Sequence, residues 1–175
     1  MKKNTIRALA TAGLIAAMYI VLTVCIAPLS YGLMQCRLAE ALTILAAYTP
    51  AAIPGLTVGC ALSNLIGLSM GANIAGAVDI LVGTLATGLA AAFSWAWRRY
   101  RVKGLPLLST LPPVLFNAVA VGTELALVAP QFTVEVWFIQ MGLVAAGQLV
   151  ACVLGGAMLA GAIRTTALDR RLGWK

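Results

Sequence analysis

The sequence predicts an all-α membrane protein, a single domain of six transmembrane helices spanning residues 1–175. Its 175 residues are 62% hydrophobic, with a mean hydropathy of +0.98 and only 10% charged residues. An ordinary soluble domain is about one quarter charged, because its surface has to be hydrated. The basic residues also fall in clusters separated by long uncharged stretches. Most of the molecular surface is therefore expected to face lipid.

The first half of the chain predicts three helices, because a membrane core of about 30 Å needs roughly 20 helical residues to cross it. Residues 8–28 are uncharged and long enough, and we interpret them as a retained first helix rather than a cleaved signal peptide. Residues 41–78 carry no charge, but Pro50 and Pro54 divide this run, because proline disfavours helix in the residue before it. We expect a short helix at 37–48 and a longer one at 51–68.

The second half predicts three more helices. A turn rich in glycine precedes a helix at 75–97, which ends at the basic cluster beginning with Arg98. A helix at 111–128 is stopped by Pro130. The last helix, at 134–163, is longer than a perpendicular span requires, so we expect it to tilt or to project beyond the bilayer.

The basic residues determine the expected orientation. With six helices and a cytoplasmic N-terminus, all of them except Arg37 fall on the cytoplasmic side, as the positive-inside rule requires. They are Lys2, Lys3, Arg7, Arg98, Arg99, Arg101, Lys103, Arg164, Arg170, Arg171 and Lys175. The net charge of +7 is thus interpreted as an orientation signal and not as a nucleic-acid-binding surface. Both termini are expected in the cytoplasm, with the chain in the cell membrane of a prokaryote.

The sequence offers little for catalysis or metal binding. It contains no histidine, which is the commonest metal ligand and general base. Its four cysteines, at positions 25, 36, 60 and 152, form no C-x-x-C pair. We expect no catalytic residue, no metal site and no disulfide framework, and an intramembrane enzyme would have only carboxylates to act with.

Polar side chains at membrane depth are the candidates for a binding site, because placing them in lipid is costly. In the expected topology all but one map to the outer half of the membrane, and the exception, Gln148, lies near the middle of the last helix. The candidates are Arg37, Glu40, Asn64, Asp79, Asn117, Glu124, Gln140 and Gln148. We expect them to line a polar cavity that opens outward.

The composition of this cavity predicts the chemistry of its ligand. Carboxylates outnumber the single guanidinium of Arg37, so the ligand should be cationic or rich in hydrogen-bond donors. A carboxylate binds two adjacent N–H donors well, as on the amino-pyrimidine edge of a guanine-like base. Tyr31, Trp137 and Phe138 are expected near the mouth, where their rings could stack on the ligand.

Structural explanations remain open for several candidates. Arg37 and Glu40 are three residues apart, so a local ion pair would equally explain them. Asp79 lies in a first helical turn, where the helix dipole favours an acid. Hydrogen bonds between helices would explain the asparagines. Glu124 is the hardest to explain structurally, because no basic residue is adjacent to it in the sequence.

Small residues repeat at four-residue spacing in the first helix, at Ala8, Ala12 and Ala16. This spacing lets helices approach closely in lipid, so it predicts either internal packing or a docking face for another membrane subunit. The chain has no Walker A loop or other phosphate-cradling glycine motif. Energy-driven transport would therefore need a partner's nucleotide hydrolysis or an ion gradient.

Four segments resemble the QueT-type substrate-binding (S) components of energy-coupling factor (ECF) transporters. They are residues 35–42, 52–60, 79–87 and 111–118, with Glu124 following the last. The resemblance implies a six-helix subunit that captures a queuosine precursor, a 7-deazaguanine base, from outside the cell. It also implies a coupling transmembrane subunit, which would contact the face of Ala8, Ala12 and Ala16, and two ATPase subunits. ATP would be hydrolysed by these partners, with no cofactor on this chain.

One other class stays open from the residues alone. In a self-contained ion-coupled transporter or channel, the same carboxylates would relay protons or ions.

Overall fold

A computed structural model describes residues 3–174, and it is helical, with no strand in that range. The long helices are α1 (Lys3–Cys25), α3 (Ala52–Ser69), α4 (Val78–Ala96), α5 (Leu111–Val128) and α6 (Val134–Gln148), and the last continues through η4 (Leu149–Gly155) into α7 (Gly156–Thr166). The short elements are α2 (Ala27–Ser30), η1 (Leu38–Ala47), η2 (Trp97–Arg99), η3 (Leu107–Thr110) and α8 (Leu168–Arg171). Among the described residues, five helical stretches are long and apolar enough to cross a membrane.

The expected second helix is present, but it is shorter than a membrane span. It is η1, a 3₁₀ helix of 10 residues. At a rise of about 2.0 Å per residue, such a helix covers about 20 Å of the roughly 30 Å hydrocarbon core. Eight of its ten residues are buried, so η1 is held by the surrounding helices. Runs of 3₁₀ helix longer than a few residues are uncommon, and tertiary packing explains this one.

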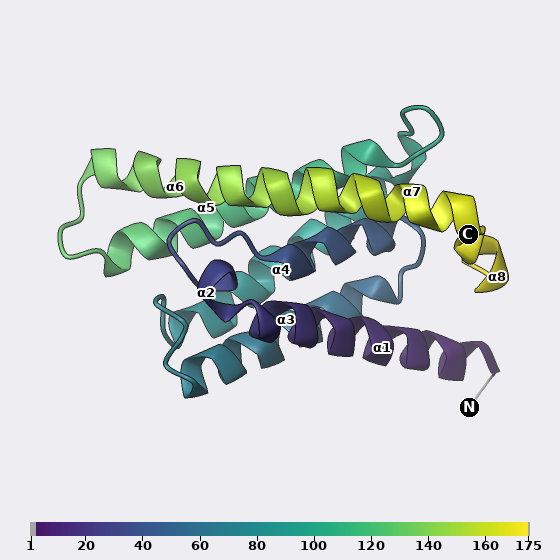
Figure 1. Ribbon diagram of the computed structural model, residues 1–175, viewed down its shortest axis with the longest axis horizontal. Helices are drawn as coiled ribbons and strands as arrows, with labels where there is room; N and C mark the ends of the chain where they lie inside the picture. The colour runs from purple at the N-terminus through teal and green to yellow at the C-terminus, as the bar shows by residue number, and fades with distance from the viewer. Residues whose placement is uncertain (1–2, 175) are drawn as a thin grey trace.

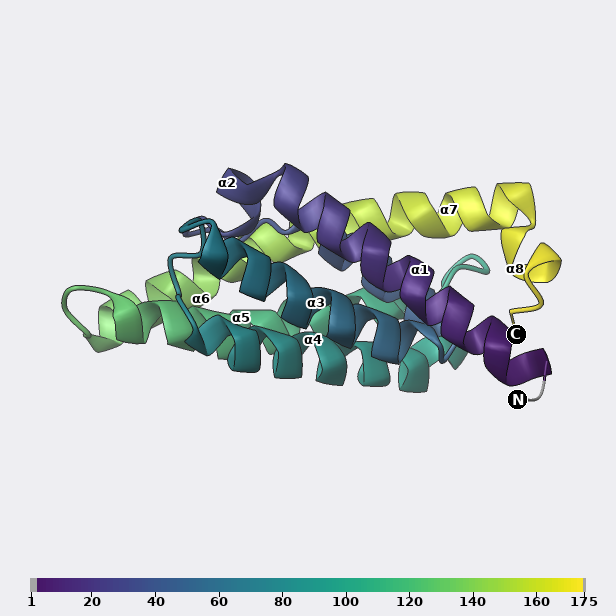
Figure 2. The same ribbon diagram turned by 90° about the horizontal axis from the view of Figure 1, so that it is seen from below.

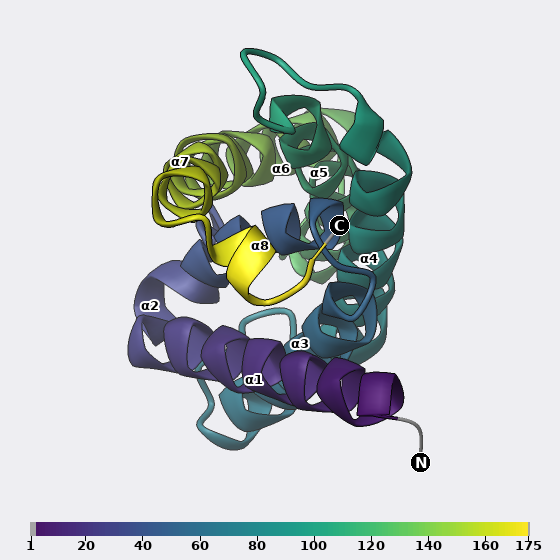
Figure 3. The ribbon, with the colours of Figure 1, turned by 90° about the vertical axis from the view of Figure 1, so that its right-hand side faces the viewer.

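The long helices form a curved wall around η1. Along this wall α1 packs on α3, α3 on α4, α4 on α5, and α5 on α6. Figure 3, seen from the end where the chain begins and ends, shows η1 inside this ring, where it contacts α1, α4, η4 and α7. Both described ends of the chain lie at this same end of the bundle, as Figures 1 and 2 show. The central position of η1 brings its two ends next to residues from most of the other helices.

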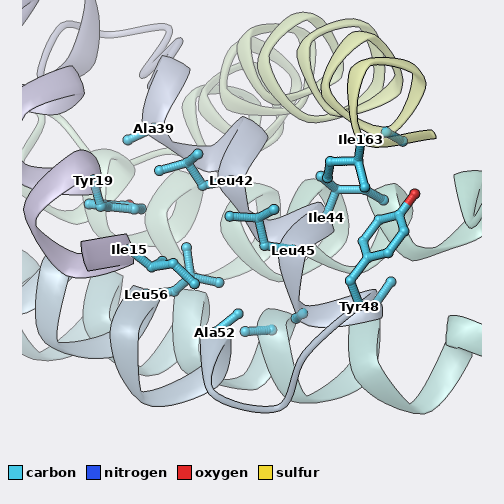
Figure 4. Close-up of a cluster of buried hydrophobic side chains, with 14 of the residues drawn as sticks. Ile15, Tyr19, Ala39, Leu42, Ile44, Leu45, Tyr48, Ala52, Leu56 and Ile163 are labelled. Atoms are coloured by element: carbon cyan, nitrogen blue, oxygen red, sulfur yellow. The ribbon is translucent and has the colours of Figure 1, made fainter. Parts of the chain in front are cut away.

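The main apolar cluster holds η1 in place. Leu42, Ile44 and Leu45 of η1 are buried with residues from α1, α3 and α7 (Figure 4). Ile163 of α7 is part of the same cluster. Between membrane helices such packing stabilises through close van der Waals contact rather than through removal of apolar surface from water, and in this chain it fixes η1 at the centre of the bundle.

The small residues of α1 are partly used inside the molecule. A Cβ at Gly55 of α3 would lie 2.7 Å from the carbonyl oxygen of Ala12, and one at Gly59 would lie 3.1 Å from the Cα of Ala16. These glycines therefore permit the close contact of α1 with α3. Ala16 is buried and Ala12 half-buried, whereas Ala8 is exposed. Internal packing thus accounts for two of the three alanines.

The long last helix is continuous, as expected, but it is not regular. Its α-helical hydrogen bonds give way to a π-helical stretch in η4, directly after Gln148. Such stretches occur in proteins mostly as short insertions, and often near functional sites. In this chain η4 packs against η1.

Candidate substrate-binding site

A buried ion pair joins the start of η1 to the start of α4. Arg37 Nη2 lies 3.1 Å from Asp79 Oδ2, and the two side chains are only 3% and 0% exposed. The same Nη2 donates to Gln35 Oε1 at 3.0 Å, and the guanidinium carbon lies 5.4 Å from the centre of the Tyr31 ring. A buried charge is costly unless it is paired, so Arg37 and Asp79 stabilise each other.

The alternative of a local Arg37–Glu40 ion pair is therefore wrong. Arg37 is the N-cap of η1, with an extended backbone (φ −85°, ψ 97°). Because it stands outside the helical part, the spacing of three residues does not place its side chain beside Glu40. Arg37 pairs instead with Asp79, 42 residues along the chain.

Asp79 also organises the turn between α3 and α4. Its Oδ2 accepts a second hydrogen bond, from Asn73 Nδ2 at 2.9 Å, and its backbone carbonyl accepts one from Asn64 Nδ2 at 2.7 Å. No side-chain hydrogen bond caps α4. Asp79 therefore acts as a hub for three polar side chains, which goes beyond the helix-dipole explanation.

Glu40 lies deeper, on η1, with different partners. Its Oε1 accepts hydrogen bonds from the Tyr19 hydroxyl of α1 and from Thr87 Oγ1 of α4, the latter at 2.9 Å. The Asn117 side chain of α5 lies close to the carboxylate, although its Nδ2 has no hydrogen-bond partner among the described residues. Three transmembrane helices thus converge on this carboxylate.

Glu124 on α5 differs from both of these acids. It is 3% exposed, and neither of its carboxylate oxygens has a hydrogen-bond partner among residues 3–174. It lies close enough to Asp79 and Arg37 for their charges to act on it. Together with Val78, Val82 and other residues of α4 and α5, it lines a cavity of about 240 Å³.

The two glutamines of α6 lie in different places. Gln148 is buried, donates from Nε2 to the Gln35 carbonyl oxygen at 3.3 Å, and accepts from Cys152 Sγ at 3.1 Å. It therefore fastens the segment before η1 to the last helix. Gln140 is half-buried and lines another cavity, of about 330 Å³, with Leu33 and residues of α5.

Only one of the three expected aromatic residues belongs to the cluster around Arg37. Tyr31 is buried, and its hydroxyl donates to the Ser63 carbonyl oxygen. Burial raises the pKa of Tyr31, which keeps the phenol protonated and donating. Trp137 instead donates to Thr123 Oγ1 of α5 at 2.8 Å, and Phe138 is 61% exposed. Trp137 and Phe138 therefore do not belong to the cluster around Arg37, and their expected place at the mouth stays a prediction.

Four contributors to the site were missed by sequence reasoning: Tyr19, Gln35, Asn73 and Thr87. Thr87 was recoverable, because it follows Asp79 by eight residues and so lies on nearly the same face of α4. Asn73 lies in the glycine-rich turn before α4, where asparagine is common for local reasons. No local sequence pattern indicates that Tyr19, a single hydroxyl in an apolar helix, would meet Glu40.

Buried polar atoms without a partner gather in this region. Among the described residues they include Gln35 Nε2, Glu40 Oε2, Asn64 Oδ1, Asp79 Oδ1, Asn117 Nδ2 and both carboxylate oxygens of Glu124. Native interiors leave few polar groups unpaired, so this concentration marks the part of the protein suited to a polar ligand. Most of these atoms are acceptors, which matches the donor-rich ligand expected from the sequence.

Comparison with known proteins assigns the family. Residues 9–165 match the QueT transporter family. The chain belongs to this family. A relative, the queuosine precursor transporter QueT of Lactococcus lactis subsp. cremoris (strain MG1363), is 33% identical over 89 residues. The match covers 50% of this chain and 48% of the relative, so the chain spans about half the length of the curated relative that it matches.

No solved structure matches the chain. This protein therefore belongs to a family of transporters and not of enzymes. With its five apolar helices, it is a multi-pass protein of a bacterial cell membrane.

Proposed function

We propose that this chain is the substrate-binding subunit of an ATP-driven ECF importer and that it captures a 7-deazaguanine base, a queuosine precursor, from outside the cell. The observation that carries the proposal is the buried, acceptor-rich cluster around Arg37, Asp79 and Glu124 in a chain of the QueT transporter family. The relative from Lactococcus lactis is named for a queuosine precursor, which supports the choice of ligand.

The unpaired atoms suit the polar edge of a deazaguanine. That edge presents an amine and a ring N–H side by side, and a carboxylate accepts such a pair of donors through its two oxygens. Glu124 has two free oxygens for this role, and Asp79 Oδ1 is a further acceptor. Asn117 Nδ2 is a free donor for the carbonyl oxygen of the base. In this proposal Arg37 positions Asp79.

The proposed topology has six crossings, with η1 as the short one and both termini in the cytoplasm. Three observations support it. Both described ends of the chain lie at the same end of the bundle, and η1 runs from the segment of Arg37 to the cavity at this end, which Tyr48 lines. The basic residues of the loop between α4 and α5 and those of the C-terminal tail lie at this end as well, as the positive-inside rule favours for the cytoplasm.

The proposed partners are a coupling transmembrane subunit and two ATPases. The sequence lacks a phosphate-cradling glycine motif, which supports the need for partners that hydrolyse ATP. On α1, the exposed alanines and glycines are Ala8, Ala10, Gly13 and Ala17, whereas Ala16 is turned toward α3. A coupling subunit that docks on α1 would therefore use these exposed residues, of which only Ala8 belongs to the Ala8, Ala12 and Ala16 repeat.

Ligand binding tests the substrate. Detergent-purified protein is titrated calorimetrically with guanine, 7-cyano-7-deazaguanine, 7-aminomethyl-7-deazaguanine and queuine. We expect saturable binding of at least one deazaguanine, weakened about tenfold or more in Glu124→Gln and unchanged in Glu135→Gln, a matched change of an exposed acid. Absence of binding to all four compounds would contradict the proposed substrate.

Reconstitution tests the energy source separately. The chain is placed in proteoliposomes alone and with the coupling and ATPase subunits, and uptake of the labelled base is followed with and without ATP. We expect uptake only with the partners and ATP. Uptake by the chain alone, driven by an ion gradient, would favour the self-contained transporter instead.

A further inference from the structure

We propose a second binding site, for a phosphate-bearing anion, at the end of the bundle where the chain begins and ends. A cavity of about 330 Å³ lies there between the end of η1, the loop between α4 and α5, and the junction of α7 with α8. Its lining includes Tyr48, Arg101, Gly104, Arg164, Asp169 and Arg170. Three guanidinium groups therefore meet one carboxylate in a single cavity.

Two of the arginines are held in place by one tight turn. Val102 and Leu105 exchange backbone hydrogen bonds of 2.8 and 3.0 Å, and the residues between them, Lys103 and Gly104, both have positive φ. This is the geometry of a two-residue hairpin turn. Arg164 Nη1 donates to the Lys103 carbonyl oxygen at 2.7 Å, and Arg101 Nη1 donates to that of Gly104 at 3.4 Å.

These contacts orient two exposed guanidinium groups without saturating them. Each guanidinium carries five N–H donors, and the turn takes one from each. A Cβ at Gly104 would lie 3.3 Å from Arg164 Nη1, so glycine lets Arg164 approach the turn closely. The donors that remain are available to an anion in the cavity.

Tyr48 contributes a hydroxyl to the cavity. The side chain as a whole is 5% exposed, yet it lines the cavity, and its hydroxyl is not among the buried polar atoms without a partner. In Figure 4 its ring borders the apolar cluster while the hydroxyl points away from Leu45 and Ala52. The charges of Arg101 and Arg164 act on this phenol, which places it on the side of the basic cavity.

The junction of α7 with α8 completes the cavity. Ala167 adopts a left-handed backbone (φ 51°), which turns the chain sharply and brings Asp169 and Arg170 to the cavity wall. The turned segment is held at its far end, where the Trp174 backbone N–H donates to the Asp169 carbonyl oxygen at 2.7 Å. The cavity is therefore built by residues from four separate segments.

The arrangement favours a phosphate over a planar carboxylate. Guanidinium groups on the hairpin turn, on α7 and on α8, with a phenol from the end of η1, surround the cavity on several sides. A tetrahedral phosphate has oxygens in several directions and pairs strongly with arginine. Basic pockets between transmembrane helices on the cytoplasmic side bind the headgroups of anionic lipids, so the inner leaflet is one source of such a group, and free phosphate is the other.

This site does not depend on the proposed substrate. Arg37 precedes η1 and Tyr48 follows it, so the two sites are separated by about 20 Å of 3₁₀ helix. Titration of deazaguanine reports on one site, and retention of anionic lipid reports on the other.

Native mass spectrometry of detergent-purified protein with added phosphatidylglycerol or phosphatidylcholine tests the lipid source. We expect preferential retention of phosphatidylglycerol, weakened about tenfold in Arg164→Gln because a charge-assisted hydrogen bond is lost. Tyr48→Phe, which keeps the ring and all the arginines, should weaken it less. Arg171→Gln is the matched control, because it removes an exposed charge from α8 without touching the cavity wall.

A second arm tests free phosphate. The melting temperature of the delipidated protein is measured with increasing inorganic phosphate, with chloride at the same ionic strength as reference. Stabilisation of the wild type that is absent in both Arg164→Gln and Tyr48→Phe supports the site with free phosphate as its ligand. Equal lipid retention and equal phosphate response in wild type and in both variants would overturn the proposal, as would a loss in Arg171→Gln as large as in Arg164→Gln.

Discussion

Asp79 and Glu124 are buried acids on neighbouring helices, and their surroundings are opposite. Asp79 on α4 has an arginine at 3.1 Å and an asparagine at 2.9 Å on the same oxygen. Glu124 on α5 has no hydrogen-bond partner among the described residues. The contrast separates two roles that look alike in the sequence: a carboxylate that holds the site together and one that is free for the ligand.

The largest effect is expected where the partnered acid is removed. Asp79→Asn keeps the shape of the side chain but leaves the Arg37 guanidinium buried without a counter-charge. Such a change costs about 3–5 kcal/mol of stability. The midpoint of thermal unfolding in detergent should fall clearly below that of the wild type.

A double-variant cycle shows whether the loss comes from the pair. Arg37→Gln combined with Asp79→Asn should be less destabilised than the sum of the single variants, because no uncompensated charge remains. Strict additivity of the two losses would mean that the ion pair is not what makes Asp79 necessary.

The free acid should show the reverse pattern. Glu124→Gln is expected to weaken binding of the deazaguanine by about ten- to hundredfold, or roughly 1.4–2.7 kcal/mol, because a neutral amide cannot accept two N–H bonds. Stability should stay within about 0.5 kcal/mol, because the carboxylate has no protein partner to lose. Calorimetric titration and thermal unfolding of the same preparation measure both quantities. A fall in stability comparable to that of Asp79→Asn would erase the distinction between the two acids.

Glu40 stands between these cases, since one of its oxygens is bonded and the other is free. Thr87→Val removes the 2.9 Å hydrogen bond to Oε1 with little change in volume, and it should cost about 1.5–3 kcal/mol, as expected for a bond to a charged group.

Thr84→Val is a matched control on the same helix, because the Thr84 hydroxyl has no partner among the described residues. The control should unfold within about 0.5 kcal/mol of the wild type. Equal losses in the two variants would show that a hydroxyl on α4, and not the bond to Glu40, is what matters.

Sequence reasoning identified the buried polar residues of this region better than the pairs that they form. The cost of a polar group in lipid picks out Arg37, Asp79 and Glu124 one at a time, and each of them is buried in the fold. Which charged residues form an ion pair depends on the local backbone conformation, and the amino-acid sequence did not reveal that conformation. The extended conformation at Arg37 turns its guanidinium toward Asp79 instead of Glu40.

The fold shows the same division. Helix ranges followed from apolar length and from prolines, and the long helices of the structure agree with them. The 3₁₀ geometry of η1 and the π-helical stretch after Gln148 did not follow, because both result from the packing of distant segments around the centre of the bundle. The hydrogen bond from Asn73 to Asp79 likewise depends on the fold, which brings the turn before α4 next to this carboxylate.

The smallest effect is expected for the aromatic residue that sequence position alone had placed at the mouth of the site. Phe138 is 61% exposed on α6, and the neighbouring Trp137 lies against α5. Phe138→Leu should therefore change the affinity for the deazaguanine less than twofold, or about 0.4 kcal/mol. Tyr31→Leu, which removes the ring beside Arg37, should weaken binding more in the same titration. A larger loss in Phe138→Leu than in Tyr31→Leu would move the ligand away from the Arg37–Asp79 pair and toward α6, and the comparison of the two acids would then no longer describe the binding site.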